Sequence, residues 1–149
     1  MRAELDDREF VSRFEDGTLP AASFHHRDHV RLAWLYLKRE PPIAALTRFA
    51  EGLKRFAARN AKPGLYHETI TWAFLFLIRE RMERDPDAGW DEFAAANPDL
   101  FQWKPSILDA YYRKETLGSD LARKVFVMPD RAMEGFPAAL RPAGDRPPL

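Results

Sequence analysis

Histidine is the residue type in this chain whose number and placement suggest chemistry. The chain has 149 residues and only four histidines. His25, His26 and His29 lie close together in the sequence, whereas His67 stands alone. Imidazole nitrogens ligate zinc, copper, nickel and iron, and three such ligands leave a coordination position open for water or a substrate. The sequence therefore suggests a metal centre, provided that the fold brings these side chains together.

The elements that must position the histidines are helices separated by prolines and glycines. Glycine-rich phosphate loops are absent, and no segment shows the strict alternation that is typical of strands. We predict helices over residues 5–15, 27–39, 42–59 and 66–84, and shorter helices over residues 90–96, 106–113 and 119–125. The sequence thus predicts an all-α fold, a helical bundle that forms one domain over residues 1–139. A Pro-rich and mobile tail is expected over residues 140–149.

Two of the predicted helices are apolar almost all the way round. Residues 30–37 and 70–78 contain few polar side chains, which is typical of buried helices. We therefore expect helices 27–39 and 66–84 to form the centre of the bundle, with short C-terminal helices added to it. Helix 42–59 joins them through short turns, so it should run antiparallel to both. The two central helices would then run parallel, and all four histidines would lie at one end of the bundle.

Helical geometry indicates which histidines point inward. At about 100° per residue, His26 and His29 fall on the apolar side of their helix, and Arg31 falls on the opposite side. His67 aligns with the apolar side of the other central helix. We therefore predict that His26, His29 and His67 face a shared interior point.

The leading hypothesis is a metal-binding helical bundle, which could be a metal-dependent enzyme acting on a small molecule. The ligands would be His26, His29 and His67. His25 could replace His26, because residues 25 and 29 are four positions apart and so lie on one face of a helix. A divalent zinc, copper, nickel or iron ion would generate hydroxide near neutral pH or act as a Lewis acid. Neighbouring groups that orient the ligands or transfer protons would be His25, Tyr66 and Glu68.

Two metal-free interpretations stay open. The positive ends of two helices could hold a small anion, which would make the protein a binding module. The histidines could instead be hydrogen-bonded residues of a structural or partner-binding bundle, because buried imidazoles need partners. Arg123 could reach a carboxylate of a ligand, although an ion pair within the protein is the more usual role.

Composition narrows the class of protein. Lys plus Arg and Asp plus Glu both number 23, so the formal net charge is zero and a strongly basic nucleic-acid binder is disfavoured. Cysteine is absent, which excludes disulfide scaffolds and cysteine nucleophiles. The charged N-terminus lacks the apolar core of a signal peptide, and residues 70–78 are too few to span a bilayer. We expect a cytoplasmic protein with a small-molecule ligand and with no nucleic-acid or membrane partner; the sequence predicts no oligomeric state.

Three blocks of the sequence resemble a family of small bacterial helical proteins. Phe24–Trp34 contains the pattern F-x-H-x-x-H, Tyr66–Thr71 begins with Y-H-E-T, and Ala122–Asp130 is similar too. The resemblance covers about residues 20–130 and supports a site at the histidines without implying a reaction. The three-His arrangement is also similar to DinB-like metal-binding bundles. Here the closely spaced histidines come early and the single one late, which departs from the order in that family.

Overall fold

The computed structural model of the chain describes residues 5–131. In this range the helices are α1 (Asp7–Asp16), α2 (His26–Arg39), α3 (Pro42–Arg59), α4 (Glu68–Arg84), α5 (Trp90–Ala96), α6 (Lys114–Leu117) and α7 (Asp120–Lys124). Four short 3-10 helices connect them: η1 (Ala21–Ser23), η2 (Pro63–Leu65), η3 (Pro98–Leu100) and η4 (Ile107–Ala110). The described residues form no strand, so the fold is all-α, as predicted. None of the helices in this range is both long and apolar enough to cross a membrane. The end of the predicted domain, residues 132–139, and the predicted tail, residues 140–149, lie outside the described residues.

Local signals in the sequence explain where most helices begin and end. The Asp6 carboxylate accepts a hydrogen bond from the Glu9 N–H at 2.8 Å and starts α1. Gly17 ends this helix with a φ of 83°, a left-handed conformation that glycine adopts without steric cost. Proline at position 42 begins α3, since proline fits a first helical turn. Ser119 caps α7, where its hydroxyl accepts a hydrogen bond from the Ala122 N–H.

The segment after α5 differs from the prediction of one helix over residues 106–113. Only the short 3-10 helix η4 forms there, and α6 follows it. The start of α6 is held by Asp130, whose carboxylate accepts hydrogen bonds from the Arg113 N–H and the Thr116 hydroxyl. Because Asp130 lies far along the chain from both partners, local periodicity could not reveal this arrangement.

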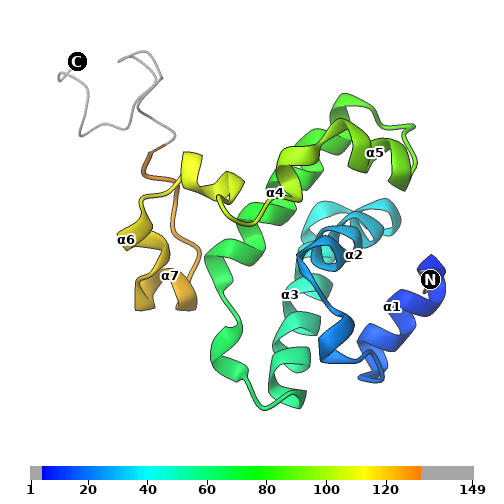
Figure 1. The fold of residues 1–149 in the computed structure, drawn as a ribbon, viewed down its shortest axis with the longest axis horizontal. Coiled ribbons are helices and arrows are strands. Elements are labelled where there is room, and N and C mark those ends of the chain that lie inside the picture. The colour runs from blue at the N-terminus through cyan, green and yellow to red at the C-terminus, as the bar shows by residue number, and fades with distance from the viewer. Residues whose placement is uncertain (1–4, 132–149) are drawn as a thin grey trace.

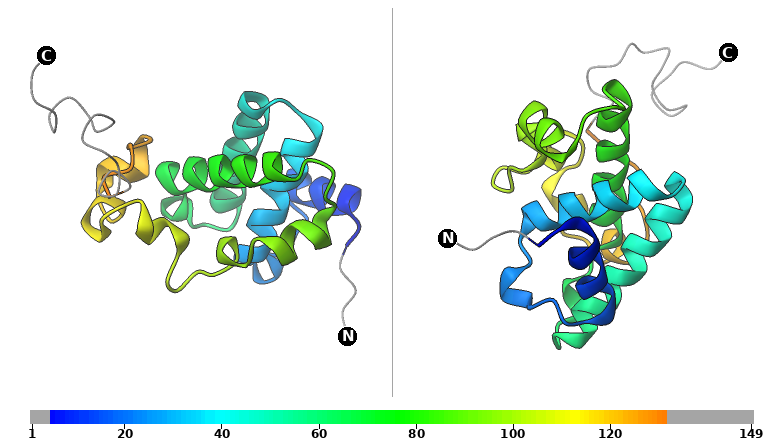
Figure 2. Two further views of the ribbon diagram at one scale, coloured as in Figure 1. Left: turned by 90° about the horizontal axis from the view of Figure 1, so that it is seen from above. Right: turned by 90° about the vertical axis from the view of Figure 1, so that its right-hand side faces the viewer.

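Three helices pack against one another and form the centre of the bundle. Helix α2 contacts both α3 and α4, and α3 also contacts α4. Helix α1 packs on α3, while α7 packs on α4 away from the N-terminal helices (Figure 1). Figure 2 shows that α2 crosses α4. The prediction from the sequence that these two helices run parallel, side by side, is therefore wrong. The beginning of α2 meets α4 well inside that helix, where the His26 ring lies 5.0 Å from the Phe74 ring, measured between the centroids.

Helix α2 contributes more residues to the main core than any other helix of the described chain, and it is buried over seven consecutive residues from 30 to 36. Arg31 belongs to this buried stretch. The prediction that it lies on the side of the helix opposite the apolar one, away from the core, is therefore wrong. Helix α1 covers that side of α2, and the Arg31 guanidinium donates hydrogen bonds to the Leu5 carbonyl and the Asp7 carboxylate. Helix α4 is buried less completely, since Phe76 remains 41% exposed.

Candidate functional site

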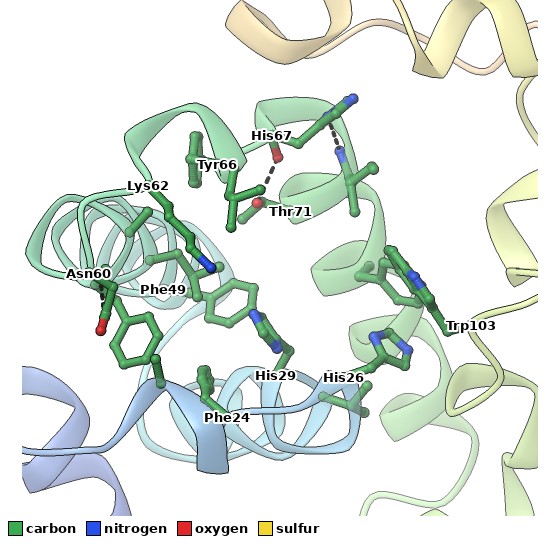
Figure 3. Close-up of a pocket in the computed structure, with 18 of the residues that line it drawn as sticks. Phe24, His26, His29, Phe49, Asn60, Lys62, Tyr66, His67, Thr71 and Trp103 are labelled. Carbon is green, nitrogen blue, oxygen red and sulfur yellow. Dashed lines mark hydrogen bonds between the residues drawn. The ribbon is translucent and has the colours of Figure 1, made fainter.

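A pocket of about 840 Å³ lies between α2, α3 and α4. We call it the central pocket. Figure 3 shows that its side chains come from all three helices and from the segments that join them. Its apolar walls include Phe24, Phe49, Leu53, Phe56, Phe74 and Ile78. A largely apolar cavity of this size is typical of sites that bind small molecules.

All three predicted metal ligands line the central pocket. His29 points into it toward Phe49, and His26 lies beside Trp103 (Figure 3). The His67 ring is turned away from the other two. Within residues 5–131, no group of three His, Asp or Glu side chains is arranged to hold a metal ion. The three-His metal centre therefore stays a prediction.

His67 caps α4 and ties it to α6. Its Nδ1 accepts a hydrogen bond from the Ile70 N–H at 3.1 Å, and its Nε2 donates one to the Leu117 carbonyl at 2.7 Å. Both ring nitrogens are thus engaged with the backbone. A metal ion could bind His67 only if one of these hydrogen bonds were broken.

Within residues 5–131, His26 and His29 each keep one ring nitrogen without a backbone partner. The Nε2 of His26 donates to the Leu100 carbonyl at 2.8 Å, and the Nδ1 of His29 donates to the His25 carbonyl at 2.9 Å. A carbonyl oxygen only accepts hydrogen bonds, so the bonded nitrogen carries the proton. Burial lowers the pKa of both rings, which keeps them neutral near pH 7. The remaining nitrogens, Nδ1 of His26 and Nε2 of His29, are then acceptors.

The predicted neighbouring groups take different places. His25 is exposed at the start of α2 and does not line the central pocket. Tyr66 does line it, and its hydroxyl donates a hydrogen bond to the Glu68 carboxylate. The same carboxylate oxygen accepts from the Trp72 indole N–H at 3.0 Å. Burial, together with Glu68, raises the pKa of Tyr66, so its hydroxyl stays protonated. Glu68 is therefore held by aromatic side chains and is not among the lining residues.

The formal charges that line the central pocket are positive. Lys62 and Arg123 are among its lining residues, and none of the described lining residues is Asp or Glu. Arg123 donates a hydrogen bond to the Gly64 carbonyl at 2.8 Å and so joins α7 to η2, rather than forming the ion pair that its sequence suggested. The Lys62 side chain extends into the pocket (Figure 3), and no hydrogen bond or ion pair joins its ammonium to another described residue.

Lys62 lines this site, although the sequence did not place it among the predicted site residues. A lysine just after the end of a helix usually complements the helix dipole, so anion binding was the less favoured interpretation of this residue. The one available hint is its place before Pro63 and Gly64, in the turn that brings the chain from α3 to α4.

Comparison with protein-family models, with curated proteins and with solved structures finds no match for this chain. The resemblance of the histidine blocks to a bacterial helical family therefore stays a prediction. The assignment of a function depends on the geometry and charge of the central pocket.

We expect the stability of the protein to decrease as the pH falls below about 6.5. Burial lowers the pKa of the pocket histidines from 6.5, and the charge of Arg123 lowers the pKa of His67 further. The unfolded chain then takes up protons near pH 6.5 that the folded chain does not, so acid favours unfolding. Stability should be nearly constant above about pH 7.

Urea unfolding at a series of pH values between 8 and about 5 measures this dependence. The carboxyl groups whose pKa is lowered on folding, such as Asp16 and Asp99, lose their stabilising contribution mainly below about pH 5, so the histidines dominate the change between about pH 7 and pH 5. An unfolding free energy that stays constant down to about pH 5 would show that the histidines are not held in their neutral form.

Proposed function

We propose that the central pocket binds a small organic acid as its anion, without a metal ion. The acid group would lie near Lys62, and the apolar body of the ligand would lie against the aromatic walls. The observation that carries this proposal is the charge of the lining: it includes two cations and no described carboxylate.

Lys62 is an exposed residue whose ammonium extends into a mainly apolar pocket (Figure 3), and this favours an anionic ligand. Lys62 has no described partner, so a carboxylate could pair with it without displacing another group. His26, the first residue of α2, and His67, which caps α4, also line the pocket, and the N-terminal end of a helix carries partial positive charge. Such an environment stabilises an anion and opposes a cation.

The shape and composition of the walls favour a ligand with a substantial apolar part. Phe49, Phe56 and Phe74 present aromatic surface to a cavity of about 840 Å³. Apolar surface removed from water contributes about 25 cal/mol per Å², so a ligand that is only a small inorganic anion would leave most of the available affinity unused. The pocket thus suits an aromatic or alkyl acid.

The metal centre with His26, His29 and His67 is the second candidate. It is favoured by the acceptor nitrogens that His26 and His29 retain on one turn of α2. It requires the His67 ring to lose its hydrogen bond with the Ile70 N–H or its hydrogen bond with the Leu117 carbonyl. A bound zinc, copper, nickel or iron ion would supply Lewis acid chemistry at this end of the pocket.

The test is isothermal titration calorimetry with phenylpropionate and octanoate. Lys62→Gln should weaken the binding of both acids about tenfold, as expected for the loss of one charged hydrogen bond. Lys54→Gln is the matched control, because the Lys54 ammonium lies over the Tyr66 ring at 5.2 Å and Lys54 does not line the pocket. Equal affinities of wild type and Lys62→Gln would contradict the proposed position of the acid group.

A further inference from the structure

His29 offers a hydrogen-bond acceptor to the interior of the central pocket. Its Nδ1 carries the proton, because that nitrogen is bonded to the His25 carbonyl. The neutral ring therefore has its lone pair on Nε2. Among the described residues, none donates a hydrogen bond to this nitrogen.

The orientation of the His29 ring is fixed by stacking. The ring lies parallel to Phe24, with 4.1 Å between the ring centroids and 3° between the planes. Figure 3 shows the ring held between Phe24 and Phe49 and directed into the pocket. The ring is thus held on one face by Phe24 and at Nδ1 by the backbone, and Nε2 is the atom left to meet a ligand.

A neutral acceptor and a cation that line the same pocket select a particular kind of acid. Lys62 has only donors to offer, so it suits a carboxylate, whereas His29 needs a donor. A ligand without a donor would remove Nε2 from water and leave it unpaired, which costs binding free energy. A ligand with a hydroxyl or a neutral N–H group avoids this cost.

We infer that the ligand of the central pocket is an organic acid that also carries a hydroxyl or neutral N–H group, which donates to Nε2 of His29. This inference rests on the proposed function and adds the substrate class to it. Hydroxy-substituted aromatic or alkyl acids are members of this class.

The inference is tested with pairs of acids that differ only in the donor. The probes are phenylpropionate and its para-hydroxyphenyl analogue, and octanoate and its omega-hydroxy analogue. In the pair whose hydroxyl reaches His29, the hydroxylated acid should bind wild type about tenfold more tightly than its parent acid. In His29→Phe this difference should vanish, whereas His25→Gln, which alters an exposed histidine outside the pocket, should keep it.

His29→Phe is a suitable variant because it keeps an aromatic ring to stack on Phe24. The His25 carbonyl also remains bonded, since it accepts from the backbone N–H groups of Asp28 and His29. Should this variant fail to fold, nitrogen NMR of the wild type still decides: the hydroxylated probe should shift the Nε2 resonance of His29 and the parent acid should not.

The possible outcomes separate this inference from the proposed function. Equal binding of both members of each pair to wild type would overturn the inference and leave acid binding intact. A preference that survives in His29→Phe would overturn the role of His29. If none of the four acids binds, the proposed function fails, and the inference fails with it.

Discussion

His67→Ala is expected to lower the free energy of unfolding by about 3 kcal/mol. The substitution removes the acceptor that caps α4 at Ile70 and the donor that satisfies the Leu117 carbonyl. Loss of a helix cap costs about 1 kcal/mol, and a carbonyl left without a partner adds about 1–3 kcal/mol. Urea unfolding of the wild type and the variant, both treated with a chelator, measures the effect.

Two further variants show which contact of His67 matters. His67→Asn can still cap α4, so it should recover about 1 kcal/mol of the loss without restoring the bond to Leu117. His25→Ala, at the exposed start of α2, should cost no more than about 1 kcal/mol. A loss below about 1 kcal/mol for His67→Ala would show that its two hydrogen bonds do not hold the fold in solution.

Ala57→Trp is expected to weaken the binding of phenylpropionate and octanoate by about a hundredfold. Ala57 lies on α3 and lines the central pocket, so an indole at this position occupies space that the ligand needs. The protein itself should keep or slightly gain stability, by about 0.5–2 kcal/mol, because the indole fills a cavity with apolar atoms. Calorimetry and urea unfolding measure the two effects on the same sample.

Ala58→Trp is the matched control for this variant. Ala58 is the next residue on α3, but it is exposed and does not line the pocket. The affinity of Ala58→Trp for the two acids should equal that of the wild type. Tight binding by Ala57→Trp would mean that the acids bind elsewhere on the protein.

The helical architecture could be predicted from the sequence because its signals are local. Prolines and a glycine after α1 mark several helix ends, and the apolar residues of α2 predict its burial. The burial of Arg31 could not be predicted in this way, since α1 covers a side of α2 that is polar in the sequence. The crossing of α2 over α4 depends on side-chain packing, which helix counts and loop lengths do not determine.

The candidate site was located by the histidines, but their hydrogen bonds could not be predicted. His26 and His67 are bonded to the carbonyls of Leu100 and Leu117, and any residue type provides such a group. Helical periodicity places His67 among the lining residues but does not predict the direction of its ring. Its φ of −133° and ψ of 111° are extended, so the ring does not follow the periodicity of the helix that it caps.

The most direct test of the proposed binding site is calorimetric titration of untagged, chelator-treated wild type with phenylpropionate and with its neutral amide. Binding of the acid at one site per chain, at least about tenfold tighter than the amide, is the predicted result. The contradictory result is that neither compound binds while zinc binds at one site per chain, and that the triple variant His26→Ala, His29→Ala, His67→Ala loses this zinc. That outcome would replace the anion site with the three-His metal centre.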